Sequence, residues 1–288
     1  MGGTVEMIDL HSHILSGLDD GARTIEESIQ MCRASYRDGI RTIVATPHTL
    51  NGLYQNDRST ILSKVQELNE AIAKCGIKSL GSKMSSYLNS ANRHSPSTMH
   101  LDSELRTPNS QLPITVLPGS DVHFSEEILR QLDQGKVTTV GDGGKYLIVE
   151  FPFHGFPYRA EEVLFQLMAR GIIPIISHPE RNLEISQRPQ RYYEMIRKGC
   201  LGQVTGMSLT GGFGPGIRRV AEKLLTHRLL HFIGSDAHSI NGRPPILSPA
   251  VRAVEKILGE EEARRMVIEY PQTILEGRRP AVPEPIPL

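Results

Sequence analysis

The sequence has few cysteines and no dominant charge, and both facts limit what the protein can do. Three cysteines, Cys32, Cys75 and Cys200, stand far apart in 288 residues and form no Cys-x-x-Cys pair. An odd, scattered set is unlike the disulfide framework of a secreted scaffold and indicates a reducing compartment. Lys and Arg together number 32, as do Asp and Glu, so no net charge would attract nucleic acid or an anionic membrane.

Long apolar runs and targeting signals are also missing. No run approaches the ~20 residues that a transmembrane helix needs. The first ten residues lack the basic and apolar segments of a signal peptide. A Gly-x-x-x-x-Gly-Lys-Ser/Thr loop is absent too, which argues against kinase or ATPase chemistry. We therefore expect a cytoplasmic protein without membrane insertion and without a nucleic-acid partner.

Seven short apolar runs rich in Val, Ile and Leu recur along the chain, and helical patterns lie between most of them. Such nearly continuous apolar runs are typical of parallel strands buried on both faces. The capping box of Thr24 and Glu27 begins a helix that ends at Gly39. Alternating strands and helices in this number predict an α/β fold closed into a barrel. The stripe expected to be buried on the first helix is Ile25, Ile29, Cys32 and Tyr36, and further helices are expected at 158–170, 216–228, 248–258 and 260–269.

Two segments depart from this pattern within what we expect to be one domain, 1–288. Residues 79–112 are rich in Ser and Asn and lack periodicity, which predicts a mobile insertion. Residues 278–288 form a Pro-rich tail, which we expect to be extended and to lie outside the core.

Polar residues follow the apolar runs. The runs end in DLHSH, ATPH, PGSDVH, VEF, ISHPER, VTGMS and GSDAH, and six of these seven ends carry His, Asp or Glu. In a βα barrel the C-terminal ends of all strands open on one face, so these side chains are expected to converge. The candidates are His11, His13, Asp20, His48, Asp121, Glu150, His178, Asp236 and His238.

So many titratable groups in one place call for cations between them. Imidazole and carboxylate ligands without thiolate suit Mn²⁺, Fe²⁺ or Zn²⁺, and nine ligands exceed the needs of one ion. Single residues have ordinary alternatives. Asp20 could be a turn residue before Gly21, and Glu150 could be a buried acid paired with an arginine. His123 and His154 fall close to the same face and stay open.

The ordered set DLHSHIL, DDGA, ATPH, PGSDVHF, IVEFP, SHPER and GSDAHSINGRPP resembles the PHP (polymerase and histidinol phosphatase) superfamily. Within it, the chain is most similar to the CpsB/CapC/YwqE group of manganese-dependent protein-tyrosine phosphatases, which are encoded with capsule or exopolysaccharide genes. The resemblance extends from Met7 to about Glu276. It implies a distorted (β/α)7 barrel, similar to a TIM barrel, with up to three Mn²⁺ ions at the C-terminal ends of the strands.

The resemblance also implies which residues hold each ion. The implied sets are His11, His13 and Asp236 for the first ion, Glu150 and His178 for the second, and Asp20, His48 and His238 for the third, with Asp121 bridging the first two. The bridging acid is usually Glu in this family, so an Asp at this position is a departure from the pattern. The insertion at 79–112 is another.

Four residues are the catalytic candidates. Arg181 and Arg243 occupy the family's phosphate-contacting positions, and their planar forks match phosphate oxygens. The alternative for Arg181 is an ion pair with the neighbouring Glu180. Asp236 or His238 is expected to move a proton to the leaving phenolate. Water shared between the metals, with a pKa lowered to roughly 7, would supply hydroxide as the nucleophile.

Three functions compete on the sequence alone. The favoured one is a metal-dependent protein-tyrosine phosphatase acting on a bacterial tyrosine kinase of capsule or exopolysaccharide synthesis. The alternatives are a small-molecule phosphatase such as one for histidinol phosphate, and a non-enzymatic protein that retains metals. A cysteine-based mechanism is excluded, because the positions six residues after the three cysteines hold Asp38, Gly81 and Gly206 instead of Arg. A homo-oligomer is compatible with the sequence.

Overall fold

The computed structural model describes residues 6–75 and 114–288. In it, parallel strands alternate with helices. Each of the seven apolar runs forms a strand, and two short strands follow the second and third runs. The strands are β1 (Met7–Ser12), β2 (Ile40–Ala45), β3 (His48–Thr49), β4 (Thr115–Pro118), β5 (Asp121–His123), β6 (Tyr146–Glu150), β7 (Ile173–Ser177), β8 (Leu201–Thr205) and β9 (Phe232–Gly234). The predicted insertion, 79–112, lies outside the described residues.

Helices follow the strands, and those predicted from the sequence are present. They are α1 (Ile25–Asp38), α2 (Arg58–Cys75), α4 (Ile128–Asp133), α5 (Ala160–Ala169), α6 (Leu183–Gln187), α7 (Gln190–Arg197), α8 (Gly206–Thr210), α9 (Pro215–Thr226), α10 (Ser248–Leu258), α11 (Glu260–Val267) and α12 (Glu269–Leu275), with 3-10 turns η2 (Val140–Asp142) and η3 (Pro179–Arg181). Within the described ranges, no helix has both the length and the apolar character that crossing a membrane requires.

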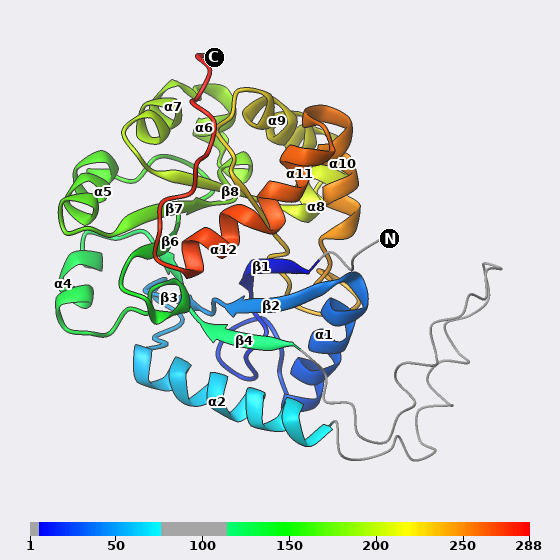
Figure 1. The fold of residues 1–288 in the computed structure, drawn as a ribbon. Coiled ribbons are helices and arrows are strands. Elements are labelled where there is room, and N and C mark those ends of the chain that lie inside the picture. Colours follow the sequence, from blue (N-terminus) through cyan, green and yellow to red (C-terminus); the bar gives the residue numbers. More distant parts are fainter. Residues whose placement is uncertain (1–5, 76–113) are drawn as a thin grey trace.

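The strands lie in the middle of the molecule, and most of the helices lie outside them (Figure 1). Parallel pairing gives the orders β1-β2-β4 and β3-β5-β6-β7-β8-β9. β3 begins after only two residues beyond the end of β2, and β5 does so beyond the end of β4. Each of these pairs therefore continues one strand position, so that the nine strands occupy seven positions. The N–H of Asp236 donates to His11 O at 2.9 Å and that of His13 to Ala237 O at 2.9 Å, which joins the end of β9 to β1. The predicted α/β fold with parallel strands is confirmed, and this junction together with the two broken strand positions fits the predicted distorted barrel.

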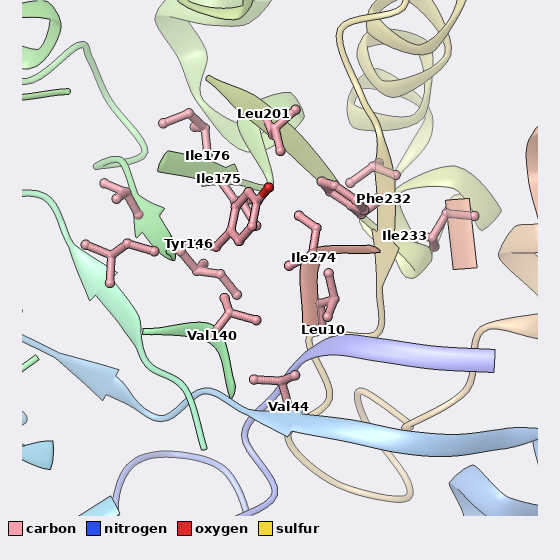
Figure 2. Close-up of a cluster of buried hydrophobic side chains, with 14 of the residues drawn as sticks. Leu10, Val44, Val140, Tyr146, Ile175, Ile176, Leu201, Phe232, Ile233 and Ile274 are labelled. Atoms are coloured by element: carbon pink, nitrogen blue, oxygen red, sulfur yellow. The ribbon is translucent and has the colours of Figure 1, made fainter. Parts of the chain in front are cut away.

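The apolar interior is one cluster to which most elements contribute. Figure 2 shows part of it, with side chains from six strands and from α12. The labelled members include Leu10, Val44, Tyr146, Ile175, Leu201, Phe232 and Ile274, all at most 2% exposed. Burial of this many large side chains supplies the main stabilisation of the barrel and fixes its strand ends in place.

Helix α1 begins and ends as its sequence predicts. The Thr24 hydroxyl accepts from the N–H of Glu27 at 3.3 Å, and Gly39 ends the helix with φ 100°, in the left-handed region that favours glycine. Its predicted apolar face packs against the core, beside residues that are buried more deeply. The fully buried residues are Ser28, Met31, Cys32 and Ser35, whereas Ile25, Ile29 and Tyr36 are only partly buried. Small serine side chains let α1 pack closely against the segment before α10. There, Ser35 Oγ donates to Pro245 O at 3.2 Å.

The C-terminal tail is extended as predicted, but it packs against the barrel. Arg278 O accepts from the Tyr146 hydroxyl at the start of β6 at 2.5 Å, and the N–H of Ile286 donates to His227 O at 2.9 Å. Val282 and Leu288 are partly buried against the core. In Figure 1 the tail is drawn in red, leading away from α12. The tail thus lies on the outside of the core, and Val282 and Leu288 attach it there.

Removing residues 280–288 should lower the free energy of unfolding by about 2 kcal/mol. The deletion exposes apolar surface now covered by Val282 and Leu288, and it breaks the backbone bond to His227. Urea denaturation of the full and shortened chains measures the difference. Equal midpoints would show that the tail contacts add nothing to stability.

Candidate metal centre

All nine residues expected to bind metal lie at or just beyond the C-terminal ends of strands, and the structure brings them together. Each has a nitrogen–oxygen distance of at most 3.7 Å to another member. Most are nearly inaccessible to solvent, and Asp20, with a 55% exposed side chain, is the most open. We call the nine the polar cup: His11, His13, Asp20, His48, Asp121, Glu150, His178, Asp236 and His238.

The polar cup contains three groups whose ligand atoms all lie within 4.8 Å of one another. The groups are His13, Asp20, His48 and His238, then His11, His13 and Asp121, and finally His48, Asp121 and Glu150. Asp121 belongs to two groups, which suits a bridging acid. His178 and Asp236 belong to none, although His178 Nε2 lies 3.5 Å from Glu150 Oε1 and Asp236 Oδ1 lies 3.4 Å from His13 Nε2. The assignment of residues to individual ions stays a prediction.

Three hydrogen bonds turn the histidines toward the centre of the polar cup. The Nδ1 atoms of His11, His13 and His238 contact Gln203 Oε1 at 2.7 Å, Asp19 Oδ2 at 2.7 Å and Asp236 O at 2.9 Å. Because these oxygens accept, each Nδ1 donates, and in the neutral form of each ring Nε2 is the atom left to bind a cation. The Nε2 atoms of His11 and His13 face each other at 3.2 Å. Two lone pairs at this distance suit a shared cation.

Two buried atoms of the polar cup lack a hydrogen-bond partner among the described residues. They are His48 Nδ1 and Asp121 Oδ2, which lie 3.4 Å apart. A buried polar atom without a partner is costly, and a cation bound to both would remove that cost. The donor set is imidazole nitrogen and carboxylate oxygen, which first-row divalent ions accept. The residues therefore fit a metal centre.

Protonation in the polar cup depends on burial and on neighbouring charges. Burial lowers the pKa of His178 to about 4, so its imidazole is neutral near pH 7, as a ligand must be. Burial also acts to lower the pKa of His13, but the charge of Asp19 overrides it and raises the pKa to about 10. A cation that binds His13 must therefore displace a proton. Burial acts to raise the pKa of Asp121, and the positive charge of His11 holds it below the usual range.

Asp236 connects the histidines to the two candidate arginines. Its Oδ1 lies 3.4 Å from His13 Nε2, and its Oδ2 accepts from Arg181 Nη1 at 2.7 Å and contacts Arg243 Nη2. Glu180 instead accepts from the Ser208 hydroxyl at 2.6 Å. The ion-pair alternative for Arg181 thus exists with Asp236 and not with its sequence neighbour. The Asp236 carboxylate therefore contacts candidate metal-binding histidines through Oδ1 and the two arginines through Oδ2.

Supporting residues around the polar cup were missed from the sequence. Asp19 is buried and accepts from the backbone N–H of His48 at 3.0 Å as well as from His13. The sequence predicted Asp20 of the LDDGA turn as the ligand, and the sequence of the turn does not distinguish Asp19 from Asp20. Gly21 lets this turn fold back, since a Cβ on it would lie 2.0 Å from His13 O. Gln203 gives no sequence signal, because it lies inside an apolar strand.

The two histidines left open take different positions. His123 Nδ1 lies 3.3 Å from Glu150 Oε2, so it borders the polar cup. His154 is exposed in the loop after β6. Sequence reasoning could not separate them, because both follow a strand end by a few residues.

The model of a family described as capsular polysaccharide synthesis, CpsB/CapC, matches residues 7–92 and 81–276. The chain belongs to this family. Tyrosine-protein phosphatase YwqE of Bacillus subtilis is 34% identical over 255 residues, which cover 88% of this chain and 86% of the relative. Tyrosine-protein phosphatase CpsB of Streptococcus agalactiae serotype III is 27% identical over 276 residues, 94% of this chain and 99% of the relative.

Solved structures agree with this membership. One is described among crystal structures of YwqE from Bacillus subtilis and CpsB from Streptococcus pneumoniae, unique metal-dependent tyrosine phosphatases. It matches with a TM-score of 0.82 and 32% identity over 98% of this chain and 99% of that one. The phosphotriesterase homology protein of Escherichia coli matches with a TM-score of 0.51 and 13% identity over 94% and 99% of the chains, which shows a shared fold alone. The predicted family is confirmed. The predicted enzyme class, tyrosine-protein phosphatase, is the class named for these relatives.

Changing Asp19 to Asn should weaken metal binding about 10- to 100-fold, because the neutral amide no longer fixes the His13 imidazole as a charged acceptor does. Titration calorimetry with Mn²⁺ measures the affinity. Asp133→Asn is the matched control, since Asp133 is an exposed acid of α4 paired with Arg170. An Asp19→Asn variant that binds Mn²⁺ like the control would contradict an orienting role.

Proposed function

We propose that this protein is a metal-dependent phosphatase that hydrolyses phosphotyrosine in proteins. The observation that carries the proposal is the arrangement at Asp236, where a cluster of imidazoles and carboxylates meets two arginines on one carboxylate. Cations and arginines are the groups that hold a phosphate monoester. Membership in a family whose named relatives are tyrosine-protein phosphatases supports the same reaction.

The nine residues of the polar cup would hold up to three divalent ions, and Mn²⁺ is the ion we propose. Asp121, a member of two groups, would bridge two of the ions. When bound, the ions neutralise phosphate charge and lower the pKa of a coordinated water to roughly 7, which supplies the nucleophile. Asp19 and Gln203 keep His13 and His11 turned toward the ions.

Arg181 and Arg243 would bind the phosphate oxygens. Both reach Asp236 Oδ2, so their guanidinium groups are held beside the polar cup before a substrate arrives. Arg243 Nε is buried and has no acceptor among the described residues. A phosphate oxygen would satisfy that donor. Charged donors held in place in this way stabilise the charge that develops on the transferred phosphoryl group.

We propose that Asp236 and His238 also anchor the groups around them, and their part in moving a proton to the leaving phenolate stays a prediction. Both carboxylate oxygens of Asp236 are engaged, one by histidines and the other by arginines. Burial acts to raise the pKa of Asp236, but the positively charged groups around it, His13 first, hold it well below the usual range. His238 donates from Nδ1 to Asp236 O and directs Nε2 toward Asp20 at 3.5 Å.

Thiol chemistry takes no part in this proposal. Cys32 and Cys200 are buried, and burial raises the pKa of each thiol to about 12. Neither forms the thiolate that a covalent mechanism needs at neutral pH. Cys75 lies at the end of α2, and no cysteine belongs to the polar cup.

The substrate we propose is a phosphorylated bacterial tyrosine kinase of capsule or exopolysaccharide synthesis, in the cytoplasm. The family name supports the pathway, and the three free cysteines suit a reducing compartment. The second candidate function is hydrolysis of a small phosphomonoester such as histidinol phosphate, which the same ions and arginines could bind. A homo-oligomer stays a prediction.

Protein loaded with Mn²⁺ should release phosphate from a phosphotyrosine peptide faster than from histidinol phosphate. Chelation should abolish both reactions, because the nucleophile is supplied by the ions. Alkylation of the cysteines should leave the rates unchanged, as two of them are buried. Phosphate release and circular dichroism are measured together. Activity that survives chelation, or that is lost on alkylation of folded protein, would contradict the proposal.

A further inference from the structure

Arg181 lies close to two phenylalanine rings. Its Cζ is 4.9 Å from the ring centroid of Phe153 and 4.9 Å from that of Phe213. Phe153 belongs to the loop after β6, and Phe213 to the segment between α8 and α9. Phe153 O accepts from the N–H of Leu183 at 2.8 Å, which fixes its loop against α6. Cation–π attraction to the two rings helps to keep the guanidinium in place.

The same two rings reach other groups of the site. The Phe153 ring stacks on His178, with centroids 6.3 Å apart and planes at 22°. The Phe213 centroid is 5.8 Å from Arg243 Cζ. We call Phe153 and Phe213 the aromatic pair. Its rings thus contact one proposed metal ligand, His178, and both proposed phosphate-binding arginines, Arg181 and Arg243.

The aromatic pair is not part of the core. Phe153 is 44% exposed, whereas Phe124 and Phe151, from the same side of the barrel, are buried. Phe213 is only partly buried. An apolar ring left open beside a polar cup, on a loop held by a backbone hydrogen bond, is typical of a binding surface. Packing in the core therefore does not explain the position of these rings.

We propose that the aromatic pair selects aryl phosphates by packing against the substrate's aromatic ring. The inference rests on the proposed function, because it takes the phosphate to be held by Arg181 and Arg243. In phosphotyrosine one oxygen joins the phosphate to the ring, so a phosphate at these arginines brings the ring alongside Phe153 and Phe213. Alkyl phosphates, including phosphoserine and histidinol phosphate, place flexible carbon there and lose the aromatic contact.

A purely structural role for the rings gives a different result. If they only hold Arg181, their loss weakens the binding of every phosphate to the same degree. If they contact the substrate, their loss weakens only ligands that carry an aromatic ring. A pair of ligands that differ in the ring alone separates the two roles.

Phenylphosphonate and methylphosphonate form such a pair, and neither can be hydrolysed by cleavage of a phosphate ester. Their dissociation constants are measured by calorimetry on Mn²⁺-loaded wild type, Phe153→Ala and Phe213→Ala. Phe165→Ala is the matched control, since Phe165 is a 65% exposed phenylalanine of α5. Circular dichroism checks folding, and Phe153→Leu and Phe213→Leu replace any alanine variant that does not fold.

Wild type and Phe165→Ala should prefer phenylphosphonate, and each variant of the aromatic pair should reduce that preference about fivefold. Methylphosphonate binding should change less than twofold. Equal weakening of both ligands would overturn the inference and leave the rings as supports of Arg181. No weakening of either, or no preference in wild type, would also overturn it. Phosphate release from a phosphotyrosine peptide, assayed on the same wild-type sample, tests the proposed function separately.

Discussion

Two buried carboxylates determine which charged groups this site must contain. Asp121 and Asp236 are at most 1% exposed, at the point where the barrel strands end. A buried carboxylate stays ionised only when positive charge or donated hydrogen bonds surround it. The protein surrounds Asp236 with arginines and imidazoles, but it leaves Asp121 Oδ2 without a hydrogen-bond partner among the described residues. A cation bound at Asp121 would complete this balance, and the proposed mechanism depends on it.

The barrel can hold these charges because they come from the ends of several strands, which meet at one face. Parallel pairing sets His48 beside Asp121 in register, and Asp236 is joined to β1 by its backbone N–H. Asp236 and His178 adopt positive φ angles of 51° and 34°, which are unfavourable for residues other than glycine. Such conformations persist where surrounding contacts enforce them. Here they aim a carboxylate and an imidazole into the same cup.

Much of this could be predicted from the sequence, because strand periodicity and strand ends are local signals. Seven apolar runs and the polar residues after them were enough to predict a barrel and a shared set of ligands. The supporting contacts could not be predicted, since they join positions far apart in the chain. The bond between His11 and Gln203 and the pairing of Arg181 with Asp236 are of this kind. The deep burial of Ser35 on α1 could not be predicted for a similar reason, because its hydroxyl donates to Pro245 O, which lies far away in the chain.

The metal content of Asp121 variants tests this account most directly. Asp121→Asn keeps the size of the side chain and removes its charge, whereas Asp121→Glu keeps the charge on a chain one methylene longer. If Asp121 bridges two ions, elemental analysis should show that the Asn variant loses at least one bound Mn²⁺ and most of its turnover of phosphotyrosine peptide. The Glu variant should keep more of both. An Asn variant with the wild-type metal content and turnover would contradict a bridging Asp121.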